Sequence, residues 1–150
     1  TRALDPTRPV NDASGWVHQD TDLWTVHLYT QDPGELARLL RQDPPHRHRP
    51  DLERYDGQPL MIDEFGGTRW PPGENADGEA WGYGDAPRDI EACYTRLAAR
   101  LEAVVASPRV RGYCYTQLTD IEQEINGLFR ADRTPKFDVE RLRGIFSAEP

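Results

Sequence analysis

"PLMIDEFGG", residues 59–67, decides the fold, because a short apolar run ends there in two carboxylates followed by two glycines. The apolar residues before Asp63 predict a buried strand. Period-2 alternation places Glu64 on the same face as Ile62 and turns Asp63 to the other face, where we expect structural hydrogen bonds or a salt bridge. The glycines allow a sharp backbone turn and leave space for a ligand. We interpret the segment as a strand that delivers the Glu64 carboxylate to a pocket.

The composition fits one domain of 150 residues, with 37% apolar residues and with 12 glycines and 13 prolines that indicate long loops. A formal net charge of −8, with Lys136 as the only lysine, argues against nucleic acid as a partner. Cys93 and Cys114 lie in apolar stretches outside any CxxC pair, so both are predicted to be buried, reduced thiols.

No stretch has the roughly 18 apolar residues that predict a membrane span, so no membrane partner is expected. No signal peptide is visible, which slightly favours the cytoplasm. The first residue is Thr1 rather than Met, and we interpret the ends as cut from a longer protein.

The order of predicted elements favours a parallel α/β sheet. Strands are expected at 8–12, 23–29, 59–64 and 110–116, and helices at 33–42, 87–107 and 139–146, with Asp85 as the N-cap of the second helix. Only about ten residues separate the first two strands, which is short for a crossover helix. Four parallel strands also leave two open edges without protective charge. Both features fit a part of a closed barrel better than a complete sheet.

Polar and aromatic residues gather at the expected C-terminal ends of the strands, where parallel α/β folds place their sites. These candidates are Asp12, His27, Tyr29, Glu64, Tyr115 and Gln117. Tyr113, Tyr115 and Gln117 are expected to share one face of their strand. Such a set predicts a pocket for a polyhydroxylated ligand, because aromatic rings stack on sugars while carboxylates and amides bind hydroxyls. Trp70 and Trp81, in the loop after Glu64, are candidates for outer sugar subsites.

No metal site and no cofactor are predicted. The histidines at 46–48 are flanked by arginines that repel a cation, and we expect a solvated loop there. The acidic segment 120–127 has its glycine at the wrong position for a calcium loop.

Four blocks of the chain resemble the C-terminal part of the catalytic barrel of glycoside hydrolase family two, which includes β-galactosidases, β-glucuronidases and β-mannosidases. The blocks are "LDPTRPVNDASGW", "DLWTVHLY", "PLMIDEFGG" and "GYCYTQLTDIEQEINGLFRADRTPK", in the order of the family. The resemblance implies that residues 1–150 are the C-terminal half, about strands five to eight, of a (β/α)₈ TIM barrel.

The family hydrolyses β-glycosides with retention through a covalent glycosyl-enzyme. The resemblance implies that Glu64 is the nucleophile and that Tyr29 contacts the nucleophile or the sugar. It also implies that Tyr115 forms a floor for the sugar ring and that Asn126 lies near the substrate. Gly67 stands where the β-galactosidases have a histidine, and this departure argues against a β-galactosidase.

The family's acid/base glutamate follows an asparagine upstream of the first block, and no Asn-Glu pair occurs in this chain. We therefore expect a fragment of a glycosidase that is nearly inactive alone and whose partners are a β-glycoside and the missing N-terminal portion of the enzyme. Two alternatives stay open. One is a carbohydrate-binding module without catalysis, and the other is a half-barrel that forms a homo-oligomer to cover its edges.

Overall fold

The computed structural model describes residues 1–43, 45–70 and 80–147 and shows an α/β fold. Its elements in chain order are β1 (Trp24–Leu28), α1 (Pro33–Leu40), β2 (Leu60–Gly66), α2 (Ile90–Val105), β3 (Val110–Thr116) and α3 (Val139–Phe146). The described helices include none long and apolar enough to cross a membrane.

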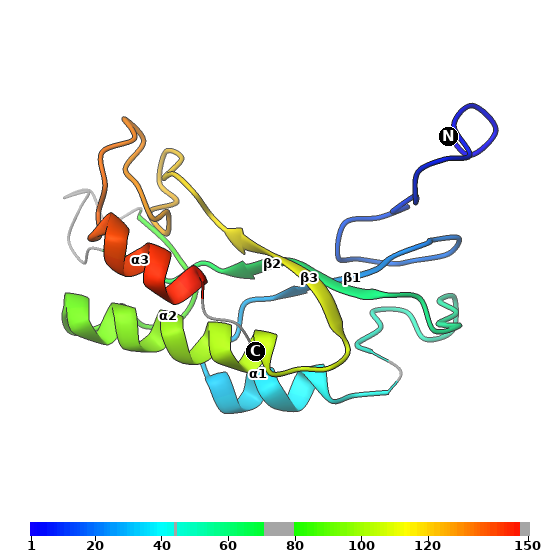
Figure 1. The fold of residues 1–150 in the computed structure, drawn as a ribbon, viewed down its shortest axis with the longest axis horizontal. Coiled ribbons are helices and arrows are strands. Elements are labelled where there is room, and N and C mark those ends of the chain that lie inside the picture. Colours follow the sequence, from blue (N-terminus) through cyan, green and yellow to red (C-terminus); the bar gives the residue numbers. More distant parts are fainter. Residues whose placement is uncertain (44, 71–79, 148–150) are drawn as a thin grey trace.

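The three strands form one parallel sheet in the order β1-β2-β3, and all three helices lie on one side of it (Figure 1). On the other side, an N-terminal arm and the loop after β3 rise at opposite ends of the sheet (Figure 1). The α/β class predicted from the sequence is confirmed. The half-barrel stays a proposal.

The helices begin where the sequence supplies side-chain caps. Asp32, Asp89 and Asp138 each accept a hydrogen bond from a backbone N–H of the first turn. The prediction of Asp85 as a cap is wrong, because α2 begins at Ile90 and the carboxylate of Asp89 accepts from the N–H of Ala92 at 2.7 Å.

The core lies between the sheet and the helices. It is built from buried apolar residues of β1, α1, β2 and α2, among them Trp24, Leu36, Ile62, Phe65 and Leu101. A smaller cluster joins α2 to α3 through Tyr94, Leu97, Leu128 and Leu142. One face of each strand is therefore fixed by the helices, and the other face is left for polar groups.

An irregularity in β2 places its two carboxylates. The pairing register shifts between Ile62 and Phe65 against β3, and between Thr25 and His27 on β1. Ile62 and Phe65 are both buried in the core although three positions separate them. Strict alternation, which predicts Asp63 and Glu64 on opposite faces, is wrong here because the irregularity lies between the two core residues.

The strand predicted at 8–12 does not form, since no strand precedes Trp24. Pro9 lacks a backbone donor and the segment has only one large apolar residue, Val10, to bury. Val10 instead pairs with Asp22. Its N–H donates to the Asp22 carboxylate at 2.7 Å, and its carbonyl accepts from the Asp22 N–H at 2.8 Å.

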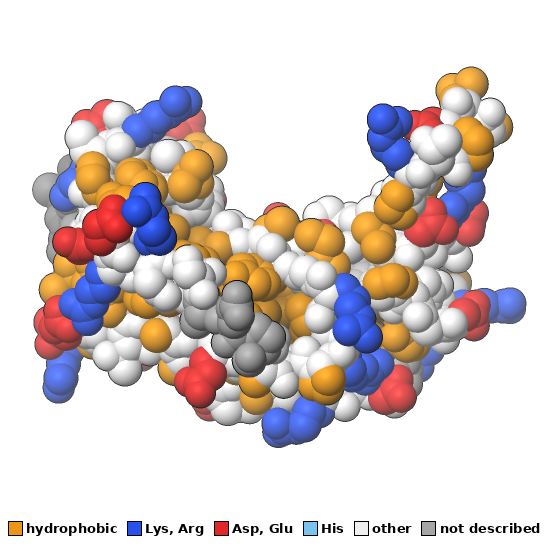
Figure 2. All heavy atoms as spheres, viewed as in Figure 1, with side chains coloured by type: hydrophobic (Ala, Val, Ile, Leu, Met, Phe, Trp, Pro, Cys, Tyr) orange, Lys and Arg blue, Asp and Glu red, His pale blue; other side chains and the backbone are white. Residues whose placement is uncertain are grey.

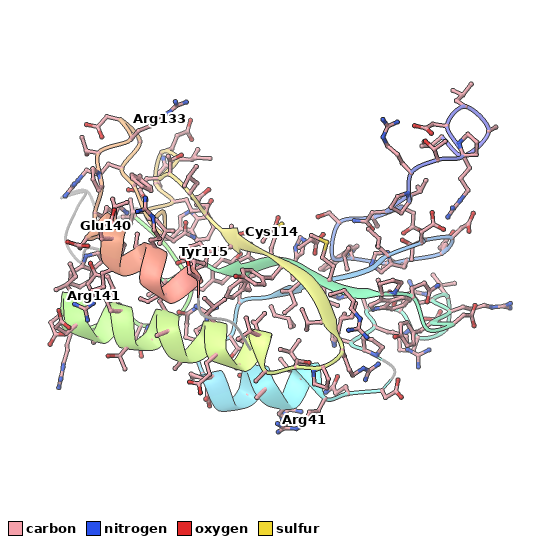
Figure 3. The ribbon with its side chains drawn as sticks, viewed as in Figure 1. Arg41, Cys114, Tyr115, Arg133, Glu140 and Arg141 are labelled. Carbon is pink, nitrogen blue, oxygen red and sulfur yellow. The ribbon has the colours of Figure 1, made fainter. Side chains whose placement is uncertain are left out.

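The two cysteines differ in their exposure to solvent. Cys93 is buried in α2, and burial raises the pKa of its thiol to about 12. The prediction that both thiols are buried is wrong for Cys114, which is exposed. Figure 3 shows Cys114 and the adjacent Tyr115 on opposite sides of β3, with Tyr115 toward α3.

Asp12 fastens the loop that precedes β1. Its carboxylate accepts from the N–H groups of Gln19 at 2.7 Å and Asp20 at 2.9 Å, and lies 2.7 Å from Nδ1 of the buried His18. Nε2 of His18 accepts from the N–H of Thr25 in β1 at 3.2 Å and lies 2.9 Å from the Thr25 carbonyl. Burial by itself raises the pKa of Asp12, but the bonds from Gln19, His18 and Asp20 outweigh it and lower the pKa to about 2.

Stability is therefore expected to depend on Asp12 at acid pH. Because its pKa is lower in the folded chain than in the unfolded one, its contribution is complete above about pH 4 and is lost as the pH falls toward 2. Asp12→Asn should lower the free energy of unfolding at pH 6 and lower it less at pH 3, as measured by urea unfolding. Exposed Asp56, replaced by Asn, is the matched control. An equal loss at both pH values contradicts the assignment.

Candidate active site

Glu64 stands near the C-terminal end of β2 with two side chains of β1 and its following loop against it. The hydroxyl of Tyr29 donates a hydrogen bond to Oε2 of Glu64. Nδ1 of His27 lies 3.3 Å from the same oxygen, and 36% of the Glu64 side chain is exposed. Both neighbours therefore lie against Oε2, and no described residue bonds Oε1, which is free to meet a ligand.

His27 also links Glu64 to Asp63. Nε2 of His27 lies 3.5 Å from Oδ1 of Asp63 and 3.2 Å from the hydroxyl oxygen of Ser14. Ser14 gives its only proton to Oδ2 of Asp63 at 2.8 Å, so Nε2 is the donor to Ser14. Asp63 makes the hydrogen bond expected of it but lies beside the site residue His27. Its expected separation from the site is wrong because of the irregularity in β2.

Three aromatic rings extend from Glu64 toward solvent. Tyr29 stacks on Tyr83 with centroids 3.8 Å apart and planes 8° apart, and Trp81 contacts Tyr83 edge-on at 5.7 Å. Burial, followed by the hydrogen bond and charge of Glu64, raises the pKa of Tyr29, so its hydroxyl stays a donor. Trp81 is 45% exposed. The rings form a stacking surface that leads away from the carboxylate.

Gly67 makes this stack possible. Its φ is +71°, and a Cβ there lies 2.4 Å from Cδ2 of Tyr83 and 3.1 Å from Cδ1 of Tyr29. The glycines after Glu64 therefore serve the close approach of the aromatic rings as well as the turn.

Gly67→Ala is expected to displace the Tyr83 ring and to destabilise the fold by about 2 kcal/mol, from positive φ and steric overlap together. Gly57→Ala is the matched control, because its φ is +90° and nothing lies within 4 Å of the added Cβ. Chemical denaturation measures both, and near-ultraviolet circular dichroism reports the stack. Equal effects of the two substitutions contradict the role assigned to the Tyr83 contact.

The loop after β3 brings a second carboxylate to the aromatic rings. Nε2 of Gln117 donates to the Asn126 side chain at 2.8 Å, and Nδ2 of Asn126 donates to Oε1 of Glu124 at 2.9 Å. Backbone bonds join Trp81 to this loop, from its N–H to the carbonyl of Gln123 at 2.9 Å and to its carbonyl from the N–H of Ile125 at 3.2 Å. Burial, then Glu124 and Glu64, raise the pKa of Tyr83, which therefore lies within the field of both carboxylates.

A buried ion pair fixes this loop. Nζ of Lys136 lies 2.6 Å from Oδ1 of Asp120 and also donates to the carbonyls of Trp70 at 2.6 Å and Ile125 at 3.0 Å. The Asp120 oxygen also accepts from the N–H of Gly127 at 2.8 Å. Asn126, between these anchors, is 1% exposed, so Gln117 and Glu124 are tied to a buried group.

The structure therefore brings together most of the predicted site residues: His27, Tyr29, Glu64, Trp81, Gln117 and Asn126. It places Tyr115 elsewhere. The Tyr115 ring packs between Phe65 and Phe146 in the helix-covered core, both at 5.6 Å, and burial raises its pKa to about 12. Tyr113 shares that face, contacting Phe65. The structure does not support the predicted role of Tyr115 as a floor for a sugar, because Tyr115 lies on the face of β3 that the helices cover.

Asp12 also lies outside the group that surrounds Glu64, since its carboxylate is committed to the loop before β1. The histidines at 46–48 lie in a loop, as expected, and His46 is exposed. His48 stacks on Trp16 at 4.1 Å and contacts the carbonyl of Gly15 at 3.1 Å. In the described part of the chain, no group of three or more His, Cys, Asp and Glu residues is arranged to hold a metal ion.

Sequence reasoning missed three residues of the site, namely Ser14, Tyr83 and Glu124. Tyr83 follows Trp81 with one residue between them, so an extended segment places both rings on one face. That spacing was a usable signal. Ser14 and Glu124 carry no such signal, because their positions depend on loops that fold back onto the sheet.

The surface of the molecule is hollowed between the N-terminal arm and the loop after β3, as Figure 2 shows. The hollow lies on the side of the sheet away from the helices (Figures 1 and 2). Glu64 is approachable from solvent, because 36% of its side chain is exposed.

Comparison with known proteins gives structural matches alone, since neither a protein-family model nor a curated protein sequence matches this chain. A GH2 β-galacturonidase from Eisenbergiella tayi matches with a TM-score of 0.63 and 16% identity, over 97% of this chain and 28% of that one. A β-glucuronidase from an uncultured Clostridium species matches with a TM-score of 0.59 and 14% identity, over 97% and 27%. The β-glucuronidase of Bifidobacterium dentium gives 0.55 and 17%, over 87% and 21%.

This chain thus spans less than a third of the length of the solved structures that it matches. At these identities the likeness shows a shared fold. The chain has the fold of one part of these glycosidases.

Proposed function

We propose that the chain carries the nucleophile half of the active site of a retaining β-glycosidase and forms the C-terminal half of its TIM barrel. The observation that carries the proposal is the surroundings of Glu64. The carboxylate is partly exposed at a strand end, one of its oxygens accepts a hydrogen bond from Tyr29 and lies 3.3 Å from Nδ1 of His27, and an aromatic surface leads away from it. The shared fold with known glycosidases supports the same reading.

In the proposed reaction, Oε1 of Glu64 attacks the anomeric carbon. A bond from carbon to Oε1 forms as the bond to the leaving oxygen breaks, and the leaving oxygen takes a proton from a second carboxylic acid. Water then attacks the same carbon, gives its proton to that second carboxylate and releases Glu64. Tyr29 holds Oε2 by its hydrogen bond, which orients the attacking oxygen.

The proton-transferring carboxylate is proposed to come from an N-terminal part of the enzyme, because no Asn-Glu pair occurs in the 150 residues. General acid assistance contributes about 10²- to 10⁴-fold. The isolated chain is therefore proposed to be nearly inactive on ordinary glycosides and active in covalent chemistry only with leaving groups that need no proton.

The matched enzymes are named for β-galacturonide and β-glucuronide cleavage, so uronides join the neutral sugars as candidate substrates. A carbohydrate-binding module without catalysis is the second candidate. The observation that favours it is the aromatic surface of Tyr29, Tyr83 and Trp81, which needs no nucleophile to bind a sugar.

The test uses 2,4-dinitrophenyl 2-deoxy-2-fluoro-β-glycosides, whose leaving group needs little acid assistance and whose fluorine slows hydrolysis of the intermediate. The chain is incubated with galactosyl, glucosyl, mannosyl, glucuronyl and galacturonyl versions, followed by intact mass and peptide mapping. An adduct on Glu64 is expected with one of them and names the sugar. Absence of an adduct with all five, together with saturable sugar binding by calorimetry, overturns the glycosidase proposal in favour of the binding module.

A further inference from the structure

The side-chain amide of Gln31 joins the ends of two strands. Nε2 of Gln31 donates to the carbonyl of Tyr29 at 2.9 Å and to the carbonyl of Gly66 at 2.9 Å. Tyr29 follows β1, whereas Gly66 ends β2 two residues after Glu64. One amide group therefore spans the two segments that carry the Tyr29 hydroxyl and the Glu64 carboxylate.

Two hydrogen bonds to its oxygen fix the orientation of this amide. Its Oε1 accepts from the hydroxyl of Thr68 at 2.6 Å and from Nη1 of Arg100 at 3.2 Å. A guanidinium has donors and no acceptor, so Oε1 has to face Arg100 and Nε2 has to face the two carbonyls. A Cβ on Gly84 lies 2.6 Å from Cγ of Gln31, so the aliphatic part is also confined.

Arg100 is the least expected group in the helix-covered core. It is 1% exposed, no carboxylate of the described residues forms an ion pair with it, and its Nε and Nη2 make no hydrogen bond there. Burial lowers the pKa of Arg100 to about 10. Burying a cation without a carboxylate partner among the described residues is costly, and the Phe65 ring, whose centroid lies 5.9 Å from Cζ of Arg100, offsets only a part of that cost. Its described polar contacts are Gln31 and Thr68.

We propose that Gln31, locked in orientation by Arg100, is a positioning residue that sets the Tyr29 hydroxyl against Glu64. Neither Gln31 nor Arg100 is placed against the sugar. They act through the backbone of Tyr29 and Gly66, whose separation determines the hydrogen bond to Oε2. The catalytic consequence rests on the proposed role of Glu64, whereas the positioning itself does not.

Gln31→Glu tests the proposal with a side chain of the same shape. The new carboxylate keeps the bonds to Thr68 and Arg100 and gives Arg100 a counter-ion, which the described residues do not supply, so the fold is retained. The substitution removes the two N–H donors to the carbonyls of Tyr29 and Gly66, and the new carboxylate repels those carbonyl oxygens. The Tyr29 hydroxyl should leave Glu64, and one more tyrosine should then ionise between pH 9 and 11.5, as read by absorbance at 295 nm. This readout requires no sugar.

The Tyr29→Phe background shows whether the additional ionising tyrosine is Tyr29. In that background, Gln31→Glu should add no ionising tyrosine. Arg100→Met should reproduce the gain and Arg100→Lys should not, since an ammonium also donates to Oε1. Arg96→Met is the control on the same helix, because Arg96 bonds the carbonyl of Asp85 outside this network. Circular dichroism at pH 8 establishes that each variant is folded.

An unchanged tyrosine titration in folded Gln31→Glu overturns the proposal, as does a gain that persists in the Tyr29→Phe background. If the wild-type chain forms the adduct on Glu64, Gln31→Glu should slow it by about 10²-fold, the usual effect of misplacing a reacting group by about 1 Å. A wild-type chain that forms no adduct counts against the proposed function and leaves the titration result standing by itself.

Discussion

Glu64→Gln is expected to abolish the adduct with the activated fluoroglycoside, lowering the rate of its formation by about 10⁴-fold or more, to below detection. The amide has the shape of the carboxylate and still accepts the Tyr29 hydrogen bond, so folding and sugar binding should change little. Only the nucleophilic oxygen is lost. Intact mass spectrometry measures the adduct, and calorimetry with the free sugar measures binding.

Glu102→Gln is the matched control, because Glu102 is exposed on α2 and is not among the groups around Glu64. It should form the adduct at the wild-type rate. Persistence of the adduct in Glu64→Gln, or its mapping to Asp63 or Glu124, assigns the nucleophile to another carboxylate. Loss of adduct and of sugar binding together indicates damage to the pocket, which Gly67→Ala should also produce.

Lys136→Met is expected to lower the free energy of unfolding by about 3–5 kcal/mol, the usual cost of leaving one charge of a buried pair unpaired. The Lys136 side chain is 0% exposed and that of Asp120 is 8% exposed. The carbonyls of Trp70 and Ile125 lose a donor in the same step. Because Asn126 and Glu124 belong to the loop that this pair fixes, sugar binding should weaken too. Guanidinium unfolding followed by circular dichroism measures the first effect.

Arg143→Met is the matched control, since Arg143 pairs with Glu140 on the surface at 2.9 Å and such pairs contribute about 0–1 kcal/mol. The double substitution Asp120→Asn with Lys136→Met should recover part of the loss, because no buried charge then remains. Similar losses for Lys136→Met and Arg143→Met contradict the structural role of the buried pair.

Local patterns determined the strands and helices well. The alternation in residues 23–29, the apolar run before Asp63 and the three- and four-residue spacing in α2 each predicted an element that forms, and β3 and α3 have the bounds expected. These elements are set by burial of one face, a property that neighbouring residues express directly. The strand at 8–12 failed because its residues lack an apolar face and Pro9 lacks a donor.

The candidate site was likewise predicted from the sequence only in part. That a carboxylate and aromatic groups stand at strand ends followed from the sequence, because the ends of parallel strands are adjacent. Which face each one takes did not follow. Alternation failed at Asp63 and Glu64, where the register of β2 shifts, and the sequence pattern that placed Tyr115 correctly beside Tyr113 could not say which face the helices cover.

The sequence by itself determined the three strands and three helices that form, their parallel arrangement and the position of Glu64 at the end of a strand. Only the tertiary structure decided what surrounds that carboxylate. Tyr83, Glu124 and the Gln31–Arg100 network reach it through contacts between residues tens of positions apart, as in the 69 positions between Gln31 and Arg100. Such contacts depend on how loops close over the sheet, and local periodicity carries no information about loop closure.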